Sequence, residues 1–320
     1  MPEFYHKPVL LDECLAGLNI RPDGVYVDGT LGGGGHSGEI LRRLTTGHHY
    51  GIDRDGEAIA AATEKIGAMG LEKNFTALRG NFHDAKALLQ AQGVTKLDGA
   101  LLDLGVSSHQ LDDGSRGFSY QGDNPLDMRM DTSAPLSARD IVNTYSQEQL
   151  SRIISLYGEE NWAVQIARVI CDRRKTAPIE TTAQLVDIID AAIPKKVRSK
   201  DGSHPARRTF QALRIAVNDE LEPLEQALRD LAGMLKPGGR LCVIAFHSLE
   251  DRIVKNTFKN LANPCTCPKE FPVCVCGKKP VVKLITNKPI TASDEELEDN
   301  PRARSATLRI CEGLGEDTRW

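Results

Sequence analysis

Short apolar segments alternate with segments of helical spacing along the first third of the chain. Runs of β-branched, aromatic and leucine residues predict four buried strands, over 25–27, 49–53, 75–78 and 97–104. The stretches that follow the first three strands predict helices over 37–44, 56–68 and 84–92. Strands separated by single helices form parallel βαβ units with right-handed crossovers. We therefore predict an α/β protein with a doubly wound, mainly parallel sheet.

This alternation stops after Gly105. Residues 106–135 are rich in glycine, serine, aspartate and proline and show no clean period, which predicts a long loop beside the strand ends. Helical patterns with start signals follow at Ser137 and over 146–157, 162–175 and 181–192, with no strand candidate between them. The pattern predicts an all-helical domain, 133–207, inserted into a sheet domain formed by 1–132 and 208–320.

The last third of the chain returns to the sheet. It predicts two helices and three strands, the helices over 209–235 and 248–261 and the strands over 240–246, 281–286 and 306–311. A turn at 236–239 should end the first helix, and Ser248 is the expected N-cap of the second, with Asp251 at N3. The last two strands predict a hairpin at the edge of the sheet.

The composition changes this picture little. Of the 320 residues, 40% are hydrophobic and 26% are charged, which is typical of globular proteins. No apolar run approaches the roughly 20 residues of a membrane span, and the first residues lack the order of a signal peptide. We expect a cytoplasmic protein with neither a membrane nor DNA as its partner.

Charge is distributed unevenly along the chain. The net charge of −4 argues against a general nucleic-acid binder, but residues 165–214 hold eleven Lys and Arg against five Asp and Glu. The basic side chains near the end of this stretch are Lys195, Lys196, Arg198, Lys200, Arg207 and Arg208. They predict contacts with RNA phosphates, and a solvated basic surface is the alternative.

A glycine-rich segment follows the first predicted strand. Five of the eight residues 28–35 are glycine, and glycine lets a backbone approach a ligand closely. Gly33, Gly35 and Gly38 also fit the spacing of a dinucleotide-binding fingerprint, with Asp53 about 20 residues further on. The segment by itself therefore leaves a nicotinamide-dependent oxidoreductase open.

Polar residues gather where the predicted parallel strands end. In an open parallel sheet ligands bind at the carboxyl ends of strands, which here carry Asp28, Asp53, Phe82, Asp103 and His247. An acidic residue after the second strand suits the hydroxyls of a ribose, an aromatic ring can cover adenine, and a carboxylate can face a cationic group. So many carboxylates favour S-adenosylmethionine, which is cationic and has no phosphate, over a dinucleotide. A noncatalytic RNA-binding protein is the third possibility.

Six segments together resemble one known family. They are Asp28–His36, Asp103–Ser108, Leu111–Phe118, Pro125–Met130, Phe246–Arg252 and Asn300–Ser305, and the chain resembles over its whole length the bacterial small-subunit ribosomal RNA cytosine-N4 methyltransferases, also called MraW-like. The resemblance implies a class I, Rossmann-like methyltransferase with a helical insertion. It also implies S-adenosylmethionine as the donor and a cytidine of 16S ribosomal RNA, near the decoding centre of the small subunit, as the substrate.

Carried over by position, the resemblance implies a set of donor-binding residues: Gly34, Gly35, His36, Asp53, Phe82, Asp103 and Gln110. For the chemistry, we hypothesise that Asp103 and Ser107 orient the cytosine amine and that His247 approaches from the fifth strand. Ser108 and Arg129 are candidate contacts with the nucleotide, although an internal ion pair of Arg129 is an equal alternative. Phe118 and Tyr120 are candidate platforms on which the base could stack.

Four of the eight cysteines form a cluster, Cys265, Cys267, Cys274 and Cys276. Four thiolates suit a tetrahedral zinc ion, but Cys-x-Cys pairs are tighter than the usual spacing with two intervening residues. A structural zinc is therefore a hypothesis, and catalysis should not require it.

Overall fold

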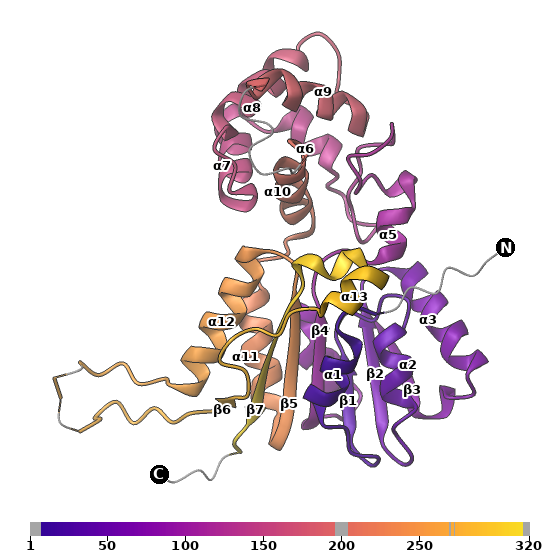
Figure 1. Ribbon diagram of the computed structural model, residues 1–320, viewed down its shortest axis with the longest axis vertical. Helices are drawn as coiled ribbons and strands as arrows, with labels where there is room; N and C mark the ends of the chain where they lie inside the picture. The colour runs from indigo at the N-terminus through magenta and orange to yellow at the C-terminus, as the bar shows by residue number, and fades with distance from the viewer. Residues whose placement is uncertain (1–7, 196–203, 269, 272, 316–320) are drawn as a thin grey trace. The chain divides into compact units, whose positions relative to one another are not determined.

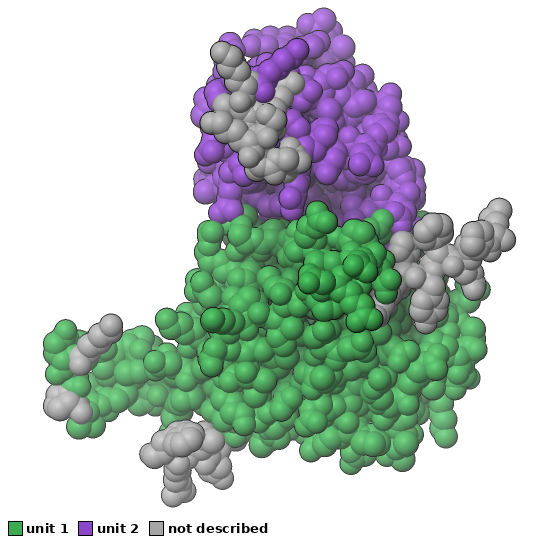
Figure 2. Space-filling view, in the orientation of Figure 1, with its two compact units in different colours: residues 1–105, 221–320 green, residues 106–220 purple. Residues whose placement is uncertain are grey.

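The computed structural model describes residues 8–195, 204–268, 270–271 and 273–315, and the chain divides into two compact units. One unit comprises residues 1–105 and 221–320 and the other residues 106–220 (Figure 2). The second unit thus extends beyond the 133–207 expected for the insertion. The reason is that Phe118, Leu126, Met128 and Met130, from the predicted loop, are buried in the core of the helical unit.

The first unit contains a seven-stranded sheet in the order β3-β2-β1-β4-β5-β7-β6 (Figure 1). The strands are β1 Val25–Asp28, β2 His48–Asp53, β3 Phe75–Arg79, β4 Leu97–Asp103, β5 Leu235–Ala245, β6 Val282–Leu284 and β7 Thr307–Gly313. Strands β1 to β5 pair in parallel, whereas β7 is antiparallel to both β5 and β6. The predicted doubly wound sheet with an edge hairpin is confirmed. Its strand order reverses between β1 and β4, where such sheets bind ligands.

Helices cover both faces of this sheet (Figure 1). They are α1 Leu11–Leu18, α2 Gly35–Leu41, α3 Gly56–Ala68, α4 Ala85–Ala91, α11 Leu224–Met234, α12 Ser248–Ala262 and α13 Asp294–Asp299, with short 3-10 turns at Glu72–Asn74, Phe82–Asp84 and Pro301–Ser305. Successive residues of β4 point to opposite faces: Leu102 packs in the core under α4, α11 and α12, and Leu101 in the core under α1 and α2. A strand buried on both faces explains why this segment is continuously apolar.

The second unit is helical. Its helices are α5 Ser108–Asp112, α6 Ala138–Thr144, α7 Gln147–Gly158, α8 Ala163–Arg173, α9 Thr182–Ala192 and α10 Arg207–Asn218, with a 3-10 turn at Gly114–Arg116. Ser137, Ser146 and Thr181 form capping boxes at the starts of α6, α7 and α9, as their sequence signals predict. Among the described helices of the whole chain, none is long and apolar enough to cross a membrane.

Two predictions for the last third are wrong. The single helix expected over 209–235 is two helices, because Asp219 takes a left-handed conformation, φ 47°, after α10. Pro223 then precedes α11, and the chain passes between the units across this break. The turn at 236–239 lies within β5, where the pairing with β4 jumps from Leu235 to Arg240.

The third difference concerns the start of α12. The N-cap is His247 and not Ser248: Nδ1 of His247 accepts a hydrogen bond from Glu250 N at 3.4 Å. The Glu250 carboxylate at N3 accepts one in return from the His247 N–H at 3.3 Å, which closes the capping box. Serine is by far the commoner N-cap residue, which is why the sequence favours Ser248.

Candidate functional site

The glycine-rich segment after β1 is hydrogen-bonded to both neighbouring strands, β2 and β4. Gly29 N–H donates to the Leu101 carbonyl of β4 at 2.9 Å, and Leu31 N–H donates to the Ile52 carbonyl of β2 at 2.9 Å. A Cβ at Gly29 would stand 2.5 Å from a methyl carbon of Leu102 and 3.1 Å from Cβ of Phe82. The segment therefore lies against the carboxyl ends of β2 and β4, where the sequence places the site.

Asp28 holds this segment in place. The residue is 1% exposed; one carboxylate oxygen accepts hydrogen bonds from Thr30 N (3.0 Å) and Thr30 Oγ1 (3.2 Å), and the other accepts one from Ser37 Oγ (2.8 Å). Burial raises the pKa of Asp28, and the hydrogen bonds oppose that shift. The position of Asp28 at the end of β1 suggests that its carboxylate faces a cationic group. Its hydrogen bonds show instead that it holds the glycine-rich segment through Thr30 and Ser37.

His49 completes this buried network. Because the Ser37 hydroxyl donates to Asp28, its oxygen must accept the 2.8 Å hydrogen bond from His49 Nε2. Burial lowers the pKa of His49 to about 3, so the ring is neutral and carries its proton on Nε2. Serine, histidine and aspartate can form a nucleophilic triad. Here Ser37 and His49 are both fully buried, so they do not form a nucleophilic site. Sequence reasoning missed both residues; a histidine within a buried strand was the available signal.

Asp53 links the glycine segment to the end of β2. Its two carboxylate oxygens accept hydrogen bonds from Gly32 N at 2.8 Å and Asp55 N at 2.9 Å. Burial raises its pKa, and both backbone hydrogen bonds lower it. Each carboxylate oxygen can accept a second hydrogen bond, so Asp53 can still receive two hydroxyl donors.

Asp103, at the end of β4, has the least satisfied carboxylate of the site. Its N–H donates to Thr30 Oγ1 at 2.6 Å, and its Oδ2 lies 3.8 Å from Nδ1 of His36. Oδ1 is buried and has no hydrogen-bond partner among the described residues. Burial raises the pKa of Asp103 to about 6, against the opposing effect of His36. An oxygen in this state is available to accept a hydrogen bond from a ligand.

His36 and Phe82 flank these carboxylates. His36 Nε2 donates to the Val9 carbonyl at 3.0 Å, because a carbonyl can only accept, and this directs Nδ1 toward Asp103. Phe82 is 8% exposed and packs edge-on against His83, with ring centroids 4.2 Å apart. The sheet unit thus brings together six of the donor-binding candidates: Gly34, Gly35, His36, Asp53, Phe82 and Asp103.

Neighbouring glycines of the segment should respond differently to alanine. Gly34 has a φ of 71°, and its Cβ would stand 3.0 Å from Cβ of Ala62, whereas a Cβ at Gly33 would meet nothing within 4 Å. We expect Gly34→Ala to cost about 1–2 kcal/mol of unfolding free energy, since L-residues are strained in that region. Gly33→Ala should cost less than about 0.5 kcal/mol. Urea unfolding of both variants checks this, and equal losses would contradict it.

His247 is placed by its capping role. Besides the hydrogen bonds of the capping box, its Nε2 lies 3.3 Å from the Glu250 carboxylate. Glu250 is 2% exposed and accepts a further hydrogen bond from Phe246 N at 2.8 Å. These contacts account for His247 structurally, and its approach to a substrate stays a prediction.

The candidates at 107–110 belong to the helical unit. Ser107 is the N-cap of α5: its hydroxyl accepts from Gln110 N at 3.2 Å, and the Gln110 side chain accepts from Ser107 N at 3.1 Å. Ser108 is the first residue of the helix and is partly exposed. Ser107, Ser108 and Gln110, which the sequence suggests for donor or substrate contacts, thus also form the start of α5. Their contacts with the donor or the substrate stay predictions.

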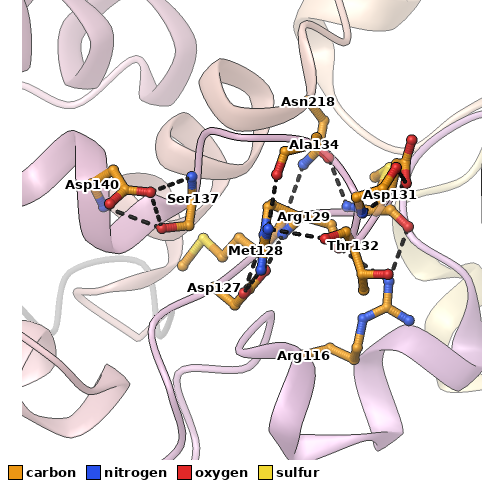
Figure 3. Close-up of polar contacts among 12 residues, drawn as sticks. Arg116, Asp127, Met128, Arg129, Asp131, Thr132, Ala134, Ser137, Asp140 and Asn218 are labelled. Carbon is orange, nitrogen blue, oxygen red and sulfur yellow. Dashed lines mark hydrogen bonds and ion pairs between the residues drawn. The ribbon is translucent and has the colours of Figure 1, made fainter.

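Arg129 makes the internal ion pair that was its alternative role (Figure 3). Its Nε and Nη2 bind the Asp127 carboxylate at 3.0 and 2.7 Å, and its Nη1 donates to the carbonyls of Thr132 (2.9 Å) and Ala134 (2.7 Å). The side chain is 26% exposed. Arg129 is thus engaged in shaping the loop, and a contact with the nucleotide stays a prediction.

Two residues that sequence reasoning did not single out fix the same loop (Figure 3). Arg116, 5% exposed, donates from Nη2 to the carbonyls of Arg129 and Met130 at 3.0 and 2.9 Å. Asn218 donates to the Met128 carbonyl and accepts from Met130 N, both at 2.8 Å. Met128 between them has a φ of 62°. For Arg116 the signal was present, since it lies in a segment that carries the family resemblance, whereas Asn218 lies outside those segments.

The aromatic candidates are already packed. Phe118 is 7% exposed in the helical core, while Tyr120 stacks on His204, with ring centroids 4.7 Å apart, and meets Phe210 edge-on at 5.9 Å.

Of the basic candidates, Lys195, Arg207 and Arg208 are exposed. Lys196, Arg198 and Lys200 lie outside the described residues.

Comparison with known proteins gives consistent matches. A model of the MraW methylase family matches residues 3–314. The chain is 56% identical to "Ribosomal RNA small subunit methyltransferase H" of Acetivibrio thermocellus and 54% identical to that of Clostridioides difficile, each over 98% of this chain and all of the relative. The protein of the same name from Lachnospira eligens is 55% identical, with 98% of both chains covered.

Proposed function

This chain belongs to the MraW methylase family, and from that premise we propose that it transfers a methyl group from S-adenosylmethionine to the N4 amine of a cytidine in small-subunit (16S) ribosomal RNA. The observation that carries the proposal is the cluster of half-satisfied carboxylates at the ends of β2 and β4, above all Asp103. We place the reaction in the cytoplasm, at the small ribosomal subunit or its RNA.

The residues of the sheet unit fit the donor. S-adenosylmethionine carries the methyl group on a cationic sulfonium, beside an ammonium, a ribose and an adenine. In our assignment Asp53 accepts the ribose hydroxyls with its remaining lone pairs, and Gly34 and Gly35 let the backbone approach the donor. Phe82, beside the glycine-rich segment, is assigned to the adenine. The negative charge of the site suits a cation and opposes a pyrophosphate, so a nicotinamide-dependent oxidoreductase is not favoured.

Asp103 is the group that we assign to the reacting amine. The lone pair of a cytosine N4 amine is delocalised into the ring, so the amine must be held in line with the methyl group, at about 3–3.5 Å. Positive charge develops on nitrogen as the methyl group is transferred, and a carboxylate that accepts an N–H hydrogen bond stabilises it. Oδ1 of Asp103, which has no hydrogen-bond partner in the described part of the chain, can do this. The proton can leave to water after transfer, so no separate general base is required.

The helical unit would bind RNA. Chemistry on a base requires it to be unstacked, and a basic surface holds the backbone while this happens. Lys195, Arg207 and Arg208 are exposed and can neutralise phosphates. Ser108 and Gln110 at the start of α5 are proposed to contact the nucleotide and the donor, respectively.

The proposal is tested by methyl transfer from labelled S-adenosylmethionine to isolated small and large ribosomal subunits. Label should enter the small-subunit RNA only. Calorimetry with S-adenosylmethionine and with NAD distinguishes a methyltransferase from an oxidoreductase. Only S-adenosylmethionine should bind. Donor binding without transfer to any RNA would instead favour a noncatalytic role.

Activity should depend on the ionisation of Asp103. The protonated acid loses much of its capacity to accept, and the pKa of Asp103 is raised by burial to about 6. We expect kcat/KM to fall about tenfold per pH unit below about 6 and to level off above about 7. His36 lowers the pKa of Asp103, so in His36→Gln the fall should begin at higher pH. A profile whose acidic limb disappears in His36→Gln would assign the ionisation to the histidine instead. Circular dichroism at each pH controls for unfolding.

Salt dependence checks the basic surface. We expect Lys195→Gln with Arg207→Gln to weaken RNA binding and to make the slope of log affinity against log salt shallower by about 0.7 per residue. The matched control is Lys255→Gln, an exposed residue of α12. Binding titrations at several salt concentrations give both quantities; equal slopes in the double variant and the wild type would leave the surface without a role in RNA binding.

A further inference from the structure

Four sulfur atoms meet in the segment that joins α12 to β6. The Sγ atoms of Cys265, Cys267, Cys274 and Cys276 all lie within 4.8 Å of one another, and none of these residues forms a disulfide. In Figure 1 this segment extends from the end of α12 away from the sheet. Its cysteines are exposed or partly exposed, unlike the buried Cys14, Cys242 and Cys311. Packing in a core therefore does not explain them.

The separations between the sulfurs are those of a tetrahedral metal site. Cys274 Sγ lies 3.5, 3.8 and 3.4 Å from the sulfurs of Cys265, Cys267 and Cys276, and Cys276 Sγ lies 3.9 Å from Cys265 Sγ. Four thiolates about 2.3 Å from a central zinc ion form a tetrahedron with edges of about 3.8 Å. Disulfide-bonded sulfurs would be separated by only about 2.05 Å.

A backbone N–H group supports one of the sulfurs as a thiolate. Val275 N–H donates to Cys267 Sγ at 3.3 Å. Such outer hydrogen bonds orient metal ligands and stabilise their negative charge. Lys278 and Lys279 follow the last cysteine after Gly277, and their charges offset that of a four-thiolate site.

The Cys-x-Cys spacing is compatible with this geometry. Residues two apart in an extended segment point to the same side, so each pair can offer two sulfurs in one direction. The sulfurs of Cys274 and Cys276 lie within 4.8 Å of those of Cys265 and Cys267, so the second pair faces the first. The Cys-x-Cys spacing is unusual for zinc, but it still places four sulfurs within the distances that a zinc site requires.

We propose that Cys265, Cys267, Cys274 and Cys276 bind one zinc ion tetrahedrally as thiolates, with release of their protons to the solvent. Four protein ligands leave no open position, so the site is structural and not catalytic. The ion would fix a segment whose described apolar side chains Phe271, Val273 and Val275 are 50%, 70% and 72% exposed. Folding of the segment would then depend on the metal.

Metal analysis of the full-length protein, purified in a reducing buffer and dialysed against a trace of zinc, tests the proposal. We expect about one equivalent of zinc in the wild type and less than about 0.1 in Cys267→Ser or Cys274→Ser. Cys171→Ser, which changes a partly exposed cysteine of the helical unit, is the matched control and should keep the metal. Substitution with cobalt should give the charge-transfer and d–d absorption of a tetrahedral thiolate site.

Two results would overturn the proposal: fully reduced wild-type protein that retains no zinc, or serine variants that retain as much as the control. Titration of all eight thiols, on denatured and chelated protein from which the reductant has been removed, verifies the reduced state, and a deficit of four there would indicate disulfides instead. Limited proteolysis provides a second readout, because chelation should speed cleavage within 263–281 in the wild type. None of these measurements involves methyl transfer, so their outcome is independent of the proposed function.

Discussion

Asp103→Ala is expected to lower kcat/KM for methyl transfer by about 100-fold, or about 3 kcal/mol, while the protein remains folded. The change removes the one carboxylate oxygen of the site that is buried without a hydrogen-bond partner among the described residues. A charge-assisted hydrogen bond that forms as the amine becomes positive is among the larger contributions that a single side chain makes. The measurement is steady-state methyl transfer, with donor affinity followed by calorimetry.

The controls separate chemistry from folding. Asp103 N–H binds Thr30 through the backbone, so that hydrogen bond survives the substitution. Asp23→Ala, at an exposed aspartate of the same unit, should keep normal turnover. If Asp103→Ala retained full turnover with the donor bound, the assignment of Asp103 to the amine would fail. The same comparison for Ser107→Ala distinguishes a contact with the amine from the loss of the α5 cap, which should cost only about 1 kcal/mol of stability.

Asn218→Ala is expected to destabilise the helical unit by about 2–4 kcal/mol. The substitution leaves the Met128 carbonyl and the Met130 N–H without their partner, and both hydrogen bonds are buried. Each unpaired buried backbone group costs about 1–3 kcal/mol. Met128 also holds a positive φ, which the surrounding contacts must maintain. Chemical denaturation, with the two units followed separately by hydrogen exchange, measures the loss.

Two further variants help to explain the loss of unfolding free energy expected for Asn218→Ala. Asn218→Asp keeps the acceptor for Met130 N–H but removes the donor to Met128, so its cost should include one of the two hydrogen bonds and a buried charge. Asn256→Ala, at an exposed position of α12, should change the unfolding free energy by less than about 0.5 kcal/mol. A loss for Asn218→Ala no greater than that of Asn256→Ala would show that the loop is held by other contacts.

The strands were the most predictable part of the fold. Residues 97–103 are apolar on both faces because helices cover both sides of the sheet, and such runs are legible without a structure. The break between α10 and α11 was missed because the apolar period continues across it. Asp219 and Pro223 were the local signals, but the change of unit between Glu220 and Leu221 follows only from the packing of the two units.

The site was predictable as a set of strand ends but not as a network. Asp53 and Asp103 were predicted from their positions at the ends of β2 and β4. The chain of hydrogen bonds from His49 through Ser37 to Asp28 joins residues far apart in sequence, and no local pattern encodes it. The apolar residues Phe118, Leu126, Met128 and Met130 have irregular spacing, so the sequence shows a loop where the structure has part of a core.

The most direct test is to analyse the nucleosides of small-subunit RNA that lacks the modification, after incubation with the wild-type protein and S-adenosylmethionine. Mass spectrometry distinguishes methyl groups on N4, on C5 and on the ribose. The account predicts N4-methylcytidine at a single position, with about 100-fold slower formation by Asp103→Ala. Methylation of another atom, or a rate unaffected by Asp103→Ala, would contradict it.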